Sequence, residues 1–181
     1  MEIKELTFFE KELYADPIKA LLKESDNDFL PPLSKRSSTL DKSFSQSPNK
    51  NGIISYFEEM QKQEILGAFE KGELVGFVSY RLNFISDIIT EIELPNIYVS
   101  TLVLSKSARG RGLTKVMYSH LFNELYADRS VFTRTWSTNA AHTKILSGFG
   151  FSELYRKKND RGDGIDTVYY KKEKSKMLIK A

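Results

Sequence analysis

The sequence predicts one mixed α/β (α+β) domain with a mostly antiparallel sheet of about seven strands and about four helices. Apolar and aromatic runs at residues 64–69 and 74–82 flank a short polar turn, which is typical of a β-hairpin. Residues 97–104 are apolar on both faces, as in a central strand. The turn at residues 109–112 contains two glycines and leads into a run of helical periodicity. Strands and helices therefore alternate along one chain.

The first third of the chain is predicted to hold a strand, two helices and a long loop. Residues 2–10 have the composition of a strand, and residues 16–23 that of a helix with Pro17 in its first turn. Residues 25–52 are rich in Ser, Pro, Asn and Asp, so we expect a long loop there, and loops of this length are often functional. Apolar residues then recur at helical spacing in residues 53–63.

The middle of the chain carries the elements around the central strand. Residues 83–96 are predicted to extend the hairpin irregularly, with Pro95 closing the extension. A helix is predicted to begin at Leu113, because apolar residues follow it at helical spacing. Residues 131–136 alternate as a strand does.

The last part of the chain is predicted to form a helix and two strands. Asn139 and the two residues before it offer caps for a helix that Gly148 can end. Residues 151–157 and 165–171 then read as strands joined by a polar turn.

Composition excludes several classes of protein. With 181 residues, of which 40% are hydrophobic and 28% charged, the chain is typical of a soluble globular domain. The absence of cysteine and the presence of only two histidines leave no disulfide and no metal site to expect. No apolar run approaches the roughly 18 residues of a membrane span, so we expect a cytoplasmic protein without membrane contact.

The positive net charge is concentrated in the tail. Five lysines against one glutamate give residues 171–181 a charge of +4, which leaves residues 1–170 at −1. We expect one domain over residues 1–172 and a basic tail over residues 173–181. A nucleic-acid-binding domain usually carries its positive charge on the folded body, so no nucleic-acid partner is predicted.

A candidate anion site lies where the central strand leads into the next helix. Gly110 and Gly112 permit close backbone approach to a ligand, and Arg109 and Arg111 add positive charge beside the free N–H groups of a helix start. Diphosphate is a fitting ligand. The alternative is a glycine-containing turn with two solvated arginines. The segment is not a Walker loop, because no Gly-Lys-Ser/Thr follows.

These residues resemble the acetyl-CoA motif of the GNAT (Gcn5-related) N-acetyltransferases, with Thr114 in place of the last Gly or Ala. Asn139, followed after eleven and twelve residues by Gly150 and Phe151, is similar to the family's second motif. The resemblance covers about residues 64–157. It implies acetyl-CoA as co-substrate, held where the fourth and fifth strands splay apart. The implied cofactor-binding residues are Leu102, Val103, Leu104, Arg109, Gly110, Arg111, Gly112, Leu113, Thr114 and Asn139.

The catalytic residues are harder to identify. The resemblance implies that a backbone N–H of Val103 or Leu104 stabilises the oxyanion. At the position where many members carry a Tyr as general acid, this sequence has Leu146. Tyr98 stands where some members carry a Glu base, and the alternative is a buried aromatic with a satisfied hydroxyl. His142 shares a helix face with Asn139 and has a pKa suited to proton transfer, or is simply a surface residue.

The resemblance implies transfer of an acetyl group to a primary amine by direct attack in a ternary complex. The acceptor is expected to be an amine-bearing small molecule or peptide, and the protein a monomer or homodimer. Residues 29–33 with Lys35 and Arg36 either form a wall of the acceptor pocket that favours a carboxylate or phosphate, or pack on the core with solvated charges. The alternative function is a CoA-binding module with little catalytic activity.

Overall fold

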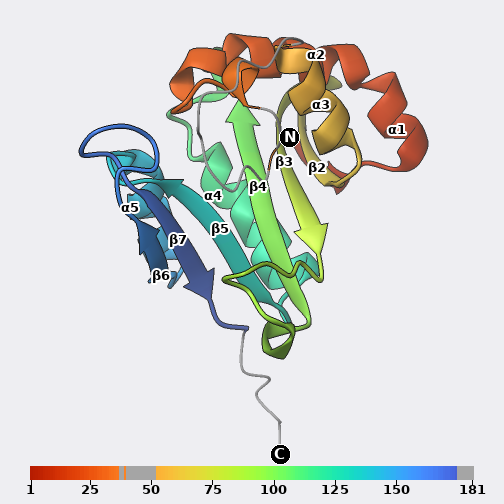
Figure 1. Ribbon diagram of the computed structural model, residues 1–181. Helices are drawn as coiled ribbons and strands as arrows, with labels where there is room; N and C mark the ends of the chain where they lie inside the picture. The colour runs from red at the N-terminus through yellow and green to blue at the C-terminus, as the bar shows by residue number, and fades with distance from the viewer. Residues whose placement is uncertain (37–38, 40–51, 175–181) are drawn as a thin grey trace, which may run out of the picture.

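The computed structural model describes residues 1–36, 39 and 52–174 (Figure 1). The strands are β1 (Glu2–Glu5), β2 (Glu64–Glu70), β3 (Glu73–Leu82), β4 (Asn96–Leu104), β5 (Ser130–Trp136), β6 (Ser152–Lys157) and β7 (Thr167–Lys172). The α-helices are α1 (Phe8–Leu13), α2 (Ala15–Glu24), α3 (Ile53–Gln61), α4 (Leu113–Ser119) and α5 (Ala140–Gly148). Short helices are η1 (Asp26–Asp28), η2 (Leu33–Lys35), η3 (Glu91–Glu93), η4 (Lys106–Ala108) and the π-helix η5 (His120–Leu125).

All seven strands form one sheet in the order β1-β2-β3-β4-β5-β7-β6. Every neighbouring pair is antiparallel except β4 and β5, which are parallel. This confirms the predicted mixed, mostly antiparallel sheet. The described residues contain five α-helices, one more than the sequence predicted.

The strands β4 and β5 pair only along their first halves. Their register runs from Asn96 opposite Ser130 to Val99 opposite Thr133, and there the pairing stops. Beyond this point the strands diverge, as Figure 1 shows. The sheet therefore opens into a gap at its centre, at the place where the resemblance puts the cofactor.

The additional helix accounts for the one element that was predicted wrongly. Residues 2–10 were expected to be a single strand, but β1 ends at Glu5. Thr7 and Glu10 form a capping box, in which the Thr7 Oγ1 accepts from the Glu10 N–H (3.3 Å) and the Glu10 carboxylate accepts from the Thr7 N–H (2.9 Å). These reciprocal bonds satisfy donors at a helix start, so the chain turns into α1.

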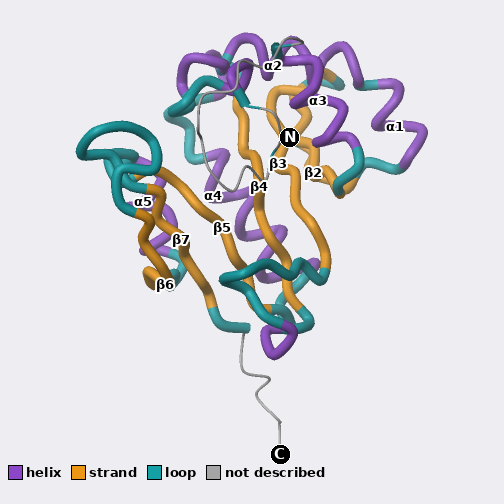
Figure 2. The backbone as a smooth tube through the Cα atoms, in the orientation of Figure 1, coloured by secondary structure: helices purple, strands orange, loops and turns teal. Residues whose placement is uncertain are grey.

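Two hydrophobic clusters hold the sheet from opposite faces. On one face, Met117 and Leu121 from the α4–η5 helical segment pack against Ile97 and Val99 of β4. On the other, α2 and α3 pack against β2, β3 and the end of β4. Figure 2 shows these helices on the two sides of the strands. Within the described residues, no helix is long and apolar enough to cross a membrane.

Candidate active site

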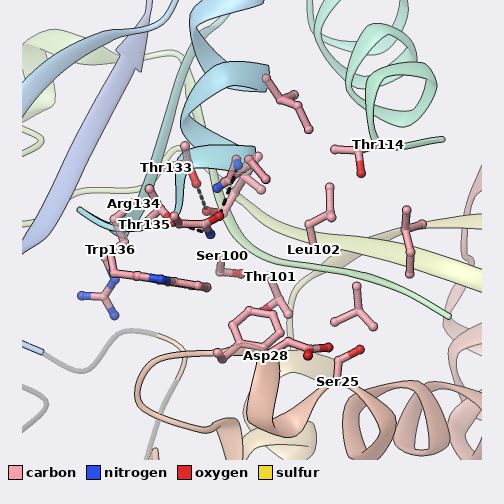
Figure 3. A pocket seen from close by; sticks show the side chains of 18 of the residues that line it. Ser25, Asp28, Ser100, Thr101, Leu102, Thr114, Thr133, Arg134, Thr135 and Trp136 are labelled. Carbon is pink, nitrogen blue, oxygen red and sulfur yellow. Dashed lines mark hydrogen bonds between the residues drawn. The ribbon is translucent and has the colours of Figure 1, made fainter. Parts of the chain in front are cut away.

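A cavity of about 260 Å³ occupies the gap between β4 and β5. Residues 99–104 of β4 and 133–136 of β5 form its walls, and side chains from the α2–η1 region, α4 and α5 close it. In Figure 3, Leu102 lies between Thr114 of α4 and Ser25 at the end of α2. The strand divergence thus creates a site that reaches from the start of α4 to the N-terminal helices.

The glycine loop meets this cavity at the start of α4. Gly110 and Gly112 have φ angles of +72° and +78°, a left-handed conformation that favours glycine. Helix α4 begins directly after Gly112, whose carbonyl already accepts from Lys115 and Val116. In the part of the chain that the structure describes, the amides of residues 110–114 donate no backbone hydrogen bond. This run of available donors fits the diphosphate of a CoA molecule.

The two arginines of the loop have different environments. The Arg109 side chain lines the cavity, where it donates to the Leu104 carbonyl (3.1 Å) and the Ser25 hydroxyl (2.9 Å) and pairs with Asp28 (2.8 Å). Arg109 therefore ties the end of β4 to the N-terminal helices. The guanidinium of Arg111 instead forms a two-point ion pair with Glu70, at 2.6 and 3.0 Å. Arg111 is not among the described residues that line the cavity.

The open edge of β4 supplies further donors. The Ser105 N–H bonds to the Val75 carbonyl on β3 (2.9 Å), and along an antiparallel pair such bonds recur at every second residue. The N–H of Val103 is therefore directed to β3, and those of Leu102 and Leu104 are directed into the gap. The Leu104 carbonyl faces the same way, since it accepts from Arg109. Of the two residues that the resemblance implied as oxyanion donors, only Leu104 directs its N–H into the gap. Leu113 is a core residue.

His142 lines the cavity from the first turn of α5. The Asn139 side chain caps this helix by accepting from the His142 N–H (3.2 Å). The imidazole Nε2 lies 2.9 Å from the Tyr118 hydroxyl of α4. Burial lowers the pKa of His142 to about 4 and raises the pKa of Tyr118. A neutral imidazole and a protonated phenol thus face each other beside the cavity.

Tyr98 lies deeper in the sheet. Its side chain is 2% exposed, packs against Phe84 with ring centroids 4.5 Å apart and belongs to a cluster with Ile89 and Phe132. It is not among the described residues that line the cavity, and burial raises its pKa. These features correspond to the buried-aromatic alternative, and the catalytic assignment of Tyr98 stays a prediction.

The end of the cavity away from α4 contains residues that the sequence did not point to. Arg134 and Trp136 lie on β5, and Arg161 comes from the turn before β7. A charged residue in the middle of the 131–136 strand was the one available signal for Arg134. Arg161 carried none, because its turn is polar throughout. Phe29 and Arg36 join them, so the predicted wall at residues 29–36 does contribute to the cavity.

Comparison with known proteins identifies the family. A model described as the acetyltransferase (GNAT) family matches residues 23–151. This chain belongs to the GNAT family. It is accordingly an acetyl-CoA-dependent N-acetyltransferase, and its open strand edge and free loop amides fit that co-substrate. Among curated proteins, no sequence matches this GNAT chain.

Several solved structures share the fold of this GNAT protein. The ribosomal-protein-alanine N-acetyltransferase from Brucella melitensis has a TM-score of 0.61 and 18% identity, covering 96% of this chain and 99% of that one. YncA from Salmonella typhimurium, solved with acetyl-CoA, has a TM-score of 0.65 and 14% identity, covering 100% and 98%. An aminoglycoside 6'-acetyltransferase type Ii has a TM-score of 0.67 and 16% identity, covering 97% and 99%.

Proposed function

We propose that this enzyme acetylates the primary amine of a small molecule or peptide by direct attack in a ternary complex. One observation carries the proposal. A single cavity reaches from Thr114, which follows the glycine loop, to Arg161, which lies in the turn between β6 and β7. One connected cavity thus lies beside both the proposed cofactor loop and the proposed acceptor wall. Acetyl-CoA supplies a thioester carbonyl that an amine can attack.

The backbone of β4 is proposed to stabilise negative charge during the reaction. The N–H of Leu104, or of Leu102, is directed into the gap and is held by a strand that pairs with β3 along its whole length. A fixed donor aimed at a developing oxyanion needs no reorganisation in the transition state. The amides of residues 110–114 are proposed to hold the diphosphate.

His142 is proposed to handle a proton together with Tyr118. Its imidazole is neutral near pH 7 and so can accept a hydrogen bond from Tyr118 or from water, although its low pKa makes it a weak base. The Tyr118 hydroxyl stays protonated and can donate. Our second proposal is that Tyr98 takes part in catalysis. Because its side chain is buried in the sheet, its proposed role is limited to orienting a water or the acceptor.

The proposed function is tested by turnover. The protein is mixed with acetyl-CoA and a panel of primary amines, and released thiol is measured while acetyl-CoA binding is followed by calorimetry. We expect binding and amine-dependent thiol release. Binding without transfer to any amine would instead indicate a CoA-binding module.

The proton assignment is tested by Tyr98→Phe, His142→Gln and Tyr118→Phe. A side chain that moves a proton contributes about 10² to 10⁴ in rate, so His142→Gln and Tyr118→Phe should lower kcat with little change in acetyl-CoA affinity. Losses below about threefold for both, with a larger loss for Tyr98→Phe, would reverse our order of the two proposals.

A further inference from the structure

Two threonines of β5 line the cavity from the same face of the sheet. Side chains alternate along a strand, so Thr133 and Thr135 share a face with Val131, which packs in one cluster with the α4–η5 helical segment. Both threonines are cavity residues and are only 3% and 2% exposed. In Figure 3 they lie across the cavity from Leu102 of β4. They are therefore on the side of the sheet that carries the proposed co-substrate site.

The hydrogen bonds of Asn139 fix the direction in which the Thr135 hydroxyl can donate. The Asn139 side chain accepts from the backbone N–H of His142 (3.2 Å), and that N–H can only donate, so this contact identifies the amide oxygen. The Asn139 Nδ2 is therefore the atom that lies 3.1 Å from the Thr135 Oγ1. Because Nδ2 can only donate, the Thr135 oxygen accepts, and its own proton is directed elsewhere.

The two threonines use their protons differently. Thr133 donates to the Val99 carbonyl of β4 (3.0 Å), and a carbonyl can only accept. No described residue accepts the proton of Thr135 in a hydrogen bond, although the side chain is buried. A buried donor without an acceptor is unfavourable. Since Thr135 lines the cavity, a bound molecule can supply the acceptor.

Acetyl transfer creates an acceptor that needs such a donor. When the amine nitrogen bonds to the thioester carbon, the carbon–sulfur bond breaks and its electron pair goes to the CoA sulfur. Leu146, which stands where many family members carry an acidic Tyr, is 0% exposed in the core and offers no proton. The proposed oxyanion donors lie on β4, so the thioester oxygen would face that strand. The sulfur, on the same carbon, is left to face β5.

We propose that the Thr135 hydroxyl donates a hydrogen bond to the CoA sulfur as it leaves, and that Asn139 positions this hydroxyl. The inference rests on the acetyl transfer proposed above. A thiolate accepts a hydrogen bond more strongly than a thioester sulfur does, so the bond favours breakage of the carbon–sulfur bond. Thr135 keeps its proton. The amine releases one proton to His142 or water and the thiolate takes one from water, so the products are the N-acetyl compound and CoA thiol.

The main test measures the pKa of the CoA thiol in its complex with the protein, which requires no acceptor amine. Thiolate absorbance is followed during a pH titration, with a CoA analogue that lacks the sulfur as the blank. A donor aimed at the sulfur lowers the thiol pKa, so Thr135→Val should raise it by about one unit, a tenfold change in proton affinity. Thr135→Ser keeps the hydroxyl and should keep the thiol pKa low.

Thr133→Val is the matched control. It removes a buried hydroxyl from the same face of the same strand, but one whose proton is already bonded to Val99. The titratable side chains that line the cavity are unchanged in these variants, so a difference in thiol pKa between them reports the hydroxyl alone.

A further variant tests the positioning role of Asn139. Serine is a good N-cap residue, so Asn139→Ser keeps a cap for α5 but removes the amide that orients the Thr135 hydroxyl. The thiol pKa should rise by less than in Thr135→Val, because the hydroxyl is still present. The double variant should match Thr135→Val, and additive rises would overturn the positioning role.

An equal thiol pKa in wild type and Thr135→Val, or equal rises in Thr135→Val and Thr133→Val, would overturn the inference. Weaker CoA binding by Thr135→Val with an unchanged thiol pKa would do the same, because it would place the bond on another atom of CoA. With an amine that is acetylated, kcat should fall about tenfold in Thr135→Val while acetyl-CoA affinity changes less than about threefold. An unchanged kcat would remove the catalytic role. If no amine is acetylated, the proposed function fails, and the thiol pKa still decides whether Thr135 contacts the sulfur.

Discussion

Gly112 places an available N–H at the start of α4, where a side chain would come close to the proposed diphosphate position. Its φ of +78° is one that Asn and Asp tolerate better than most residues, and a Cβ added there would meet no atom within 4 Å. Gly112→Asp should therefore fold but repel phosphate. We expect acetyl-CoA affinity to fall at least about tenfold, equivalent to about 1.4 kcal/mol, as measured by calorimetry.

Gly112→Asn is the matched control for this change. Asn has the size of Asp and similar backbone tolerance but no charge, so it should lose less affinity than Gly112→Asp. A second control is Gly72→Asp in the β2–β3 turn, where φ is +84° and no cofactor contact is expected. Unchanged binding by Gly112→Asp would remove the proposed phosphate loop.

His142 makes the folded state sensitive to acid. Burial lowers its pKa from 6.5 to about 4, so between these values the unfolded chain binds a proton that the folded chain does not. Stability contributed by the neutral imidazole is therefore lost as pH falls from about 7 to 5, by up to about 2 kcal/mol. His142→Gln should lose correspondingly less over that range in urea unfolding, and Tyr118→Phe should keep most of the sensitivity. Identical pH dependence in wild type and His142→Gln would contradict this assignment.

The residues of the site differ in how far the sequence could predict them. The glycine loop and Asn139 depend on local spacing, which a sequence shows directly. The partner of Arg111 is Glu70, 41 residues away, and only the antiparallel sheet brings them together. The bond between His142 and Tyr118 likewise requires two helices to pack, so the sequence alone left a surface position for His142 open.

At the scale of elements, α3 is tied to the central strand by a buried hydrogen bond. The Tyr56 hydroxyl lies 2.7 Å from the Thr101 hydroxyl, and the two side chains are 0% and 2% exposed. Tyr56→Phe would leave Thr101 buried without this partner and should cost about 1 to 3 kcal/mol in urea unfolding. The double variant with Thr101→Val should cost less than the sum of the single changes. Strict additivity would show that the bond contributes little.

Elements with a strong periodic pattern were predicted well, and the exceptions have local causes. The hairpin of β2 and β3, the central strand and the helices after residues 112 and 139 all formed near their predicted positions. The N-terminal strand was too long, because the apolar residues Phe8 and Phe9 suited a strand while the Thr7–Glu10 capping box favoured a helix. The capping pair was present in the sequence and is the signal that should have decided it.

At the scale of the whole molecule, the two parts of the sheet meet through a short parallel ladder. Four residue pairs, from Asn96–Ser130 to Val99–Thr133, join β4 to β5. Apart from this ladder, β5, β7 and β6 are attached to the rest of the sheet by side-chain packing and by loop contacts. The Phe29–Trp136 and Arg161–Leu30 contacts span the opening. No periodicity in the sequence indicates where a parallel pair will separate, so the gap was predictable only through the family resemblance.

Because the proposed co-substrate site fills this gap, acetyl-CoA should stabilise both parts together. At about one hundred times its dissociation constant, a ligand specific for the folded state contributes about 2.7 kcal/mol, or roughly 5 to 10 °C in Tm for a chain of this size. Hydrogen exchange should slow at the amides of Leu102 and Leu104, which are directed to the open edge of β4. At the same ligand concentration, a tenfold loss of affinity in Gly112→Asp should reduce the stabilisation to about 1.4 kcal/mol, with a correspondingly smaller rise in Tm. A rise in Tm without slower exchange in β4 would place the ligand elsewhere, since binding at the open edge necessarily protects its amides.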